Sequence, residues 1–204
     1  MKKLMKLSLM IITIFIFSIT SNLAQVAPEN SVKIEAGSSG LALVGTNSGG
    51  TQAGPYFGGT IAYGAGQGVS LFAESGYGYT NYDADDNLSL VQVPVLVGAV
   101  YNFGEVLNSD LVQPYAGLAA GVSNHFLQND WNTVKADGYE QKSTNFAFEG
   151  ILGVDFQITP AFAVNVRGQY THGFKKDGDP GLDSQEFNSV KFGGGLSYTF
   201  SMPH

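Results

Sequence analysis

The feature that most constrains the fold is a pair of alternating segments within residues 146–172, separated by a short turn at 158–161. Apolar side chains occupy every second position before and after the turn. Side chains on a β-strand point alternately to opposite faces, so the pattern predicts an antiparallel hairpin with one apolar and one polar face. Each segment has about ten residues, the length of a tilted strand that crosses a bilayer. Charges at mid-strand on the polar face favour a wet barrel interior over a dry core.

The first residues of the chain have the features of an export signal. Lysines precede an apolar run over residues 7–19, and small and polar residues follow it. The run is shorter than a membrane-spanning helix, and this order of residue types is typical of a cleavable secretory signal peptide. We therefore predict a signal peptide over residues 1–24 and one domain over residues 25–204, which is long enough for a sizeable core.

The composition excludes several classes of function. The chain contains no cysteine, which rules out disulfides, thiolate metal sites and a lipid-modified cysteine after the signal. Without the three lysines of the signal, seven basic residues face 17 acidic ones, a net charge near −10. Such a domain repels the phosphates of nucleic acids. The 27 glycines, 14 phenylalanines and 10 tyrosines indicate many strands joined by tight turns.

Eight alternating segments follow one another, with no helical periodicity of useful length between them. They span residues 31–44, 55–64, 69–81, 88–103, 111–122, 143–159, 162–172 and 188–200. Outer-membrane barrels have an even number of strands, short periplasmic turns and long extracellular loops. With both termini in the periplasm, the long polar connections at 45–54, 123–142 and 173–187 are all extracellular. The sequence thus predicts an all-β fold, an eight-stranded antiparallel up-and-down transmembrane β-barrel.

Aromatic side chains form two bands in this arrangement. The periplasmic band comprises Tyr63, Tyr101, Phe103, Phe156, Phe162, Tyr198 and Phe200, and the extracellular band Phe57, Tyr77, Tyr79, Phe146, Phe148, Tyr170 and Phe192. Amphipathic rings prefer headgroup depth, so two bands are typical of a barrel that crosses a membrane. The alternative explanation is aromatic packing inside a soluble β-sandwich.

The polar positions of the strands predict a filled interior. By alternation the inward set comprises Lys33, Glu35, Glu74, Gln92, Glu149, Asp155, Asn165, Arg167, Gln169 and Lys191. Both signs of charge occur, so ion pairs across the lumen can satisfy these groups. An eight-stranded barrel is only wide enough for side chains to fill it, so we interpret the set as a structural polar network that plugs the lumen. Small inward residues leave room for it: Gly76, Gly117, Gly153, Gly193 and Gly195.

Several motifs resemble small bacterial outer-membrane β-barrel proteins of the porin-family or OmpA/OmpX-like type. Residues 90–96 (LVQVPVL) with 101–103 (YNF) are similar to their fourth strand, 114–121 (PYAGLAAG) to their fifth, 153–160 to the sixth with its turn, and 196–200 (LSYTF) to the closing strand. The resemblance implies a monomeric barrel in a Gram-negative outer membrane, surrounded by membrane lipid and lipopolysaccharide and inserted by the barrel-assembly machinery. The family usually ends on an aromatic residue, whereas residues 201–204 follow Phe200 here.

No set of residues indicates catalysis, a metal centre or a cofactor. His125 and His172 lie near the predicted extracellular rim, but neither has the His-x-Ser spacing that a nucleophilic serine and its base would need on one strand. Two acidic loops lack the spacing of an EF-hand, so we expect solvated loops, with weak divalent-cation binding as the alternative. These loops contain Asp83, Asp85 and Asp86, and Asp177, Asp179, Asp183 and Glu186.

The long connection at 123–142 carries Phe126, Trp131 and Tyr139, which are candidates for contact with an extracellular partner. Fold alone does not define function, so several hypotheses remain. The leading one is a non-enzymatic outer-membrane barrel with a structural or surface-interaction role through four extracellular loops. The others are a narrow pore for ions or small solutes, a lipid-modifying outer-membrane enzyme, and a soluble secreted barrel.

Overall fold

The computed structural model describes residues 29–45, 51–82, 85–129, 132–136, 139–174 and 186–201. The predicted signal peptide lies outside these ranges. The described part contains eight long strands: β1 (Ser31–Val44), β2 (Gly54–Gly66), β3 (Val69–Tyr82), β4 (Asp85–Asn102), β5 (Val112–Asn129), β9 (Lys142–Gln157), β10 (Phe162–Gly173) and β11 (Phe187–Ser201).

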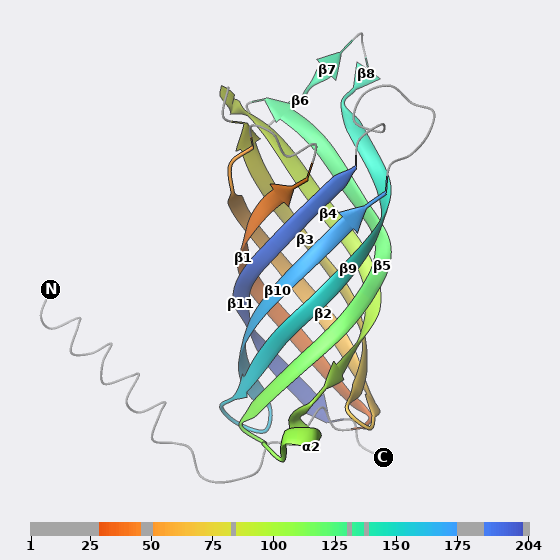
Figure 1. Cartoon of the computed structure of the whole chain (residues 1–204), viewed down its shortest axis with the longest axis vertical. Coiled ribbons are helices and arrows are strands. Elements are labelled where there is room, and N and C mark those ends of the chain that lie inside the picture. Colours follow the sequence, from red (N-terminus) through yellow and green to blue (C-terminus); the bar gives the residue numbers. More distant parts are fainter. Residues whose placement is uncertain are drawn as a thin grey trace, which may run out of the picture.

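These strands form one antiparallel sheet that closes into a barrel (Figure 1). Each long strand pairs with the next long strand in the chain, and β11 pairs with β1 along its length, from Ser31↔Ser201 to Val44↔Asn188. Closure gives both edges of each long strand a partner, which a sheet surrounded by hydrocarbon requires. The predicted eight-stranded antiparallel up-and-down β-barrel is confirmed.

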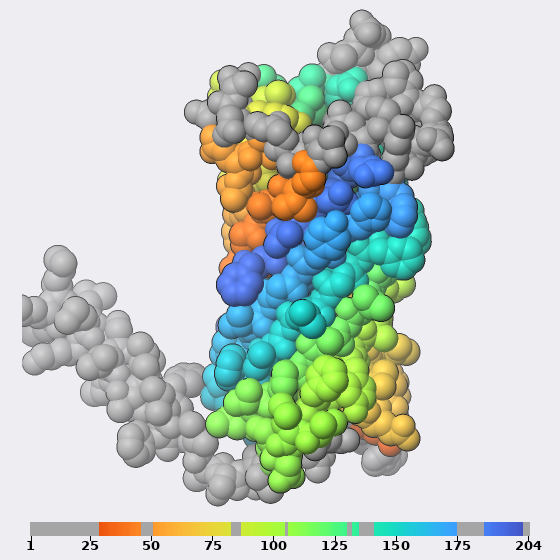
Figure 2. All heavy atoms as spheres, viewed as in Figure 1, coloured from red at the N-terminus to blue at the C-terminus, as the bar shows by residue number. Residues whose placement is uncertain are grey.

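The two faces of the wall have opposite character. On the outside, Ile61, Leu118 and Leu152 have exposed fractions of 60%, 73% and 68% at mid-strand. On the inside, charged side chains such as Glu74 and Lys191 are 2% and 1% exposed. Figure 2 shows the outer side chains of β9, β10 and β11 covering the wall that faces the viewer. Apolar groups outside and charges inside are the arrangement expected of a barrel that lipid surrounds.

The fifth strand differs most from its predicted segment. β5 continues to Asn129, well beyond the predicted end at residue 122, and pairs with β4 as far as Leu88↔Asn129 and with β9 as far as Phe126↔Lys142. The prediction was wrong because polar residues occupy both faces here. On the outer face, the Asn124 amide donates to Val93 O at 3.3 Å and accepts from the Thr144 hydroxyl at 2.8 Å.

Short elements complete the two ends of the barrel. Beyond β5, the two-residue strand β6 (Asn132–Thr133) extends the barrel sheet at the upper end in Figure 1. The two-residue strands β7 (Lys135–Ala136) and β8 (Tyr139–Glu140) pair with each other in a separate small sheet. At the lower end, α2 (Gly104–Leu107) is a single turn between β4 and β5. The described residues contain no helix long and apolar enough to span a membrane.

Candidate functional site in the barrel interior

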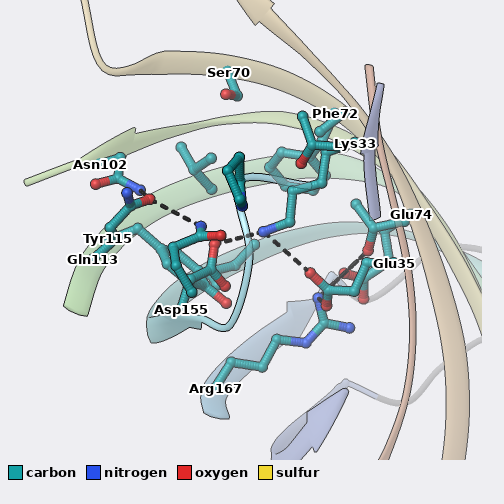
Figure 3. A pocket seen from close by; sticks show the side chains of 17 residues that line it. Lys33, Glu35, Ser70, Phe72, Glu74, Asn102, Gln113, Tyr115, Asp155 and Arg167 are labelled. Carbon is teal, nitrogen blue, oxygen red and sulfur yellow. Dashed lines mark hydrogen bonds and ion pairs between the residues drawn. The ribbon is translucent and has the colours of Figure 1, made fainter. Parts of the chain in front are cut away.

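A continuous chain of charged side chains crosses the interior, and its lower part is shown in Figure 3. This series of charged side chains begins at Asp155 on β9, where Lys33 Nζ on β1 donates to Asp155 Oδ2 at 2.6 Å. Lys33 Nζ also lies 3.7 Å from Glu35 Oε2, and Glu35 Oε1 lies 2.8 Å from Arg167 Nη1 on β10. Acidic and basic groups therefore alternate along this part of the lumen.

The alternation continues through the middle of the barrel. Arg167 Nη1 lies 3.5 Å from Glu74 Oε2 on β3, and Lys191 Nζ bridges Glu74 at 3.2 Å and Glu149 at 2.7 Å. Gln169 donates to both carboxylates, at 3.0 Å to each Glu74 oxygen and 2.7 Å to Glu149 Oε1. Buried charges are costly unless they are paired and hydrogen-bonded, and this arrangement supplies both kinds of partner.

The Arg167–Glu74 contact in this series of charges spans the full width of the barrel. Three strands separate β3 from β10 in either direction around the sheet, so Glu74 and Arg167 extend from opposite walls. Their ion pair, with the Gln169–Glu74 hydrogen bonds beside it, occupies the centre of the lumen. An eight-stranded barrel has little further width there.

An apolar layer lies between these charged side chains and the end of the barrel that carries β6. Leu90 and Phe187 are 2% and 3% exposed and form its core, with Leu43, Tyr82 and Leu127 packed against them. The His125 ring stacks on Phe187 with a centroid separation of 4.1 Å. The predicted position of His125 in a loop at the rim is therefore wrong: His125 is fully buried in the barrel, because β5 continues through it.

The interior also contains a serine and histidine pair that the His-x-Ser pattern did not detect, because its order is reversed. Ser123 and His125 lie two residues apart on one face of β5, with 3.4 Å between Oγ and Nε2, and Gln92 donates to the same hydroxyl at 3.1 Å. Both members are at most 1% exposed, so lipid outside the wall does not reach them. His172 has a different setting near the end of β10, where its Nδ1 lies 2.6 Å from Asn188 Oδ1.

A small cavity occupies the half of the lumen nearer to α2, seen in Figure 3. Its volume is about 70 Å³, and the charges of Lys33 and Asp155 line one part of it, with Asn102, Gln113 and Tyr115 in another. The Asn102 amide donates to Gln113 Oε1 at 3.2 Å. A water molecule takes up about 30 Å³ in the liquid, so the cavity has room for a few waters.

Two buried tyrosines belong to the interior and were missing from the predicted set. Tyr56 is 1% exposed and its ring lies 4.6 Å from Lys191 Nζ, while Tyr115 is 9% exposed beside Lys33. Glycines make space for both rings: a Cβ at Gly76 would overlap the Tyr56 hydroxyl, and one at Gly153 would meet the Tyr115 ring. The inward glycines in the sequence could therefore have indicated these tyrosines, because the space beside an inward glycine has to be filled by a large side chain.

The remaining predicted residues are placed as follows. All ten predicted inward polar side chains lie inside the barrel, Asn165 and Gln92 among them. Phe126 is half-buried in the upper part of β5, away from the charged side chains of the interior. Trp131 and most of the acidic loop residues lie outside the described residues, as do the side chains of Tyr139, Asp85 and Asp86.

A barrel with an apolar exterior and a charged interior is the architecture of an outer-membrane protein. The chain matches the family model described as outer membrane protein beta-barrel domain over residues 11–200, and it belongs to that family. The protein is therefore a barrel of the bacterial outer membrane, as the motifs in its strands had predicted. No curated protein sequence matches the chain.

Solved structures with the same fold come from several bacteria. Neisserial surface protein A (NspA) aligns with a TM-score of 0.62 at 13% identity, covering 84% of this chain and 100% of its own. The N-terminal barrel domain of OprF from Pseudomonas aeruginosa gives 0.51 at 20% identity, with coverage of 84% and 98%. The attachment invasion locus protein Ail of Yersinia pestis gives 0.51 at 13% identity, with coverage of 84% and 100%. At these identities the likeness is one of fold.

Proposed function

We propose that this protein is a non-enzymatic, plugged barrel with a structural or surface-interaction role through its four extracellular loops. The observation that carries the proposal is the Arg167–Glu74 ion pair, which joins opposite walls through the centre of the lumen. The apolar layer around Leu90 and Phe187 adds a second obstruction above it. Ions do not pass a layer of this kind without rearrangement, because desolvating a charge is costly.

The proposal also includes how the protein is exported and which molecules surround it in the membrane. Residues 1–24 are removed as a signal peptide, and residues 25–204 are inserted by the barrel-assembly machinery as a monomer among lipid and lipopolysaccharide. The interaction partner meets the loops from outside. One similar structure, Ail of Yersinia pestis, is a complex with the heparin analogue sucrose octasulfate, at a TM-score of 0.53 and 13% identity. Without the signal peptide, seven basic residues face 17 acidic ones, and this negative charge disfavours a polyanion of that class as the partner of the present protein.

The second candidate function is a narrow pore, and the cavity in the periplasmic half of the lumen favours it. That cavity has room for water beside Lys33 and Asp155, and only the central ion pairs and the apolar layer separate it from the other end of the barrel. A lipid-modifying enzyme has less support, because the Ser123–His125 pair faces the interior. Unchanged lipid A profiles after gene deletion and in a His172→Ala variant would end that alternative.

Conductance in planar lipid bilayers separates the plug from the pore. We expect the purified wild-type barrel to give no discrete channel openings over the voltage range that the bilayer tolerates. Discrete openings in the wild type whose amplitude changes in Arg167→Ala would contradict the plug and support the pore. Lys142→Met, which removes an exposed lysine from the upper end of β9, is the matched control for a change of charge away from the lumen.

A further inference from the structure

The connection between β4 and β5 presents an apolar surface at the periplasmic end of the barrel. Val106, Leu107 and Leu111 are 70%, 57% and 60% exposed, and we refer to these three residues as the periplasmic apolar patch. The connection, green in Figures 1 and 2, lies at the lower end of the barrel. Large aliphatic side chains gathered on a surface commonly mark a site of contact with a membrane or another protein.

Hydrogen bonds hold this connection in one shape. The Gly104 amide donates to Asn102 Oδ1 at 2.8 Å, and the Leu107 amide donates to Phe103 O at 3.0 Å within the helical turn. On the other side of the turn, the Val112 amide donates to Ser109 Oγ at 3.2 Å. The apolar side chains are therefore held outward by a fixed backbone.

The other two periplasmic turns reverse the chain without such side chains. Between β2 and β3, the reversal takes place through Gly66, Gln67 and Gly68, all with positive φ. Between β9 and β10, the Thr159 hydroxyl accepts hydrogen bonds from the amides of Ala161 and Phe162. Reversal of the chain thus needs neither a helical turn nor exposed aliphatic residues, so the patch requires another explanation.

The patch continues the lipid-facing wall of the barrel. Tyr101 and Phe103, each 38% exposed, form an edge-to-face ring pair with centroids 5.0 Å apart directly before α2. After the connection, β5 begins with Val112, 36% exposed, opposite the exposed ring of Phe156. The patch is thus joined on both sides to side chains at the edge of the wall that meets lipid in this outer-membrane protein.

We infer that the periplasmic apolar patch inserts into the interfacial region of the inner leaflet, with phospholipid as its occupant. Aliphatic side chains gain by leaving water for this region, and nearby aromatic rings prefer the same depth. The contact anchors the barrel on the side of β4 and β5, which sets its depth and tilt. This role is independent of whether the lumen conducts.

Quenching of tryptophan fluorescence by brominated lipid tests the contact. In a Trp131→Phe background, which removes the chain's one tryptophan, a reporter is placed at position 106 (Val106→Trp) or 107 (Leu107→Trp). The barrels are reconstituted in vesicles of phosphatidylcholine brominated near the headgroup or deep in the acyl chain. Leu118→Trp is the control within the wall, and Gln67→Trp, in the β2–β3 turn, is the control at the same end without the patch.

The depth of quenching decides between lipid and other occupants. We expect at least one of Val106→Trp and Leu107→Trp to lose a fraction of its emission similar to that of Leu118→Trp, with stronger quenching by the shallow bromines. For Leu118→Trp the deep bromines quench more strongly. Emission at both positions as insensitive to brominated lipid as that of Gln67→Trp would overturn the inference and leave the patch to a periplasmic protein or a second copy. Migration of unboiled samples on SDS gels verifies that each variant is folded.

Discussion

At the scale of single residues, each lumen charge is stabilising only while its partners remain. Lys191 lies between Glu74 and Glu149 and is 1% exposed, so its ammonium separates two buried carboxylates. Removing one partner from a buried charged group typically costs about 3–5 kcal/mol. We expect Lys191→Met to lower the free energy of unfolding by about 3 kcal/mol. Guanidinium unfolding of the barrel in phospholipid vesicles measures this change.

Two further variants identify the cause of that loss. Lys142→Met removes an exposed lysine, and we expect it to leave the unfolding midpoint nearly unchanged. Adding Glu149→Gln to Lys191→Met neutralises one of the two carboxylates, so the double variant should recover part of the lost stability. A loss that is the same with and without Glu149→Gln would indicate that packing of the lysine stem, and not its charge, is the source of the effect.

At the scale of elements, the sequence predicted strands well and their partners across the lumen poorly. Strict alternation located β3 and β10 to within a residue at each end, because lipid outside and charge inside select opposite residue types. The pairing of Lys33 with Asp155 joins residues 122 positions apart and depends on the stagger of the closed sheet. That stagger leaves no trace in the alternation of a single strand.

The alternation was also lost where a strand leaves the membrane. Beyond Val122, β5 carries polar residues on both faces, Asn124 outside and His125 inside, and a strand of this kind resembles a loop in sequence. Tyr56 was missing from the predicted interior because the prediction placed aromatic rings in the lipid-facing bands and polar side chains in the lumen. An aromatic ring that points inward fits neither group. Its partner Gly78, directly opposite in the register, shows that large and small residues are matched across strands.

Hydrogen exchange of β5 tests the continuation of this strand above the apolar wall. Residues 123–126 pair with both β4 and β9, and the Leu127 amide donates to Gln141 O at 3.0 Å. We therefore expect the amides of residues 123–127 to exchange as slowly as those of residues 115–122. Exposed Ala53, which lies just before β2, is the fast-exchanging reference. Rapid exchange from residue 123 onward would mean that β5 ends at Val122, where the alternation of apolar and polar residues ends.

At the scale of the whole molecule, the interior is organised in layers from one end to the other. A small cavity lies toward the end that carries α2, a series of alternating charges crosses the middle, and apolar side chains around Leu90 and Phe187 fill the upper part. On β5 the apolar outer wall ends near Val122, so polar Asn124 lies outside the upper layer, to which His125 and Phe187 belong. The plug, the lipid contact of the wall and the patch beside α2 all depend on closure of the sheet by β1 and β11, since an open edge in lipid would leave backbone groups unpaired.

A disulfide across the closing seam tests this architecture directly, because the chain has no cysteine of its own. Ala36 on β1 and Leu196 on β11 face each other in the register, and facing residues of antiparallel strands lie within the Cα separation of a disulfide. We expect Ala36→Cys with Leu196→Cys to oxidise in membranes and to give a boiled, non-reduced SDS-gel band whose mobility reverts with reductant. Ala36→Cys with Leu118→Cys, on the opposite wall, should not cross-link. Failure of the first pair, or equal cross-linking of both, would refute closure between β1 and β11.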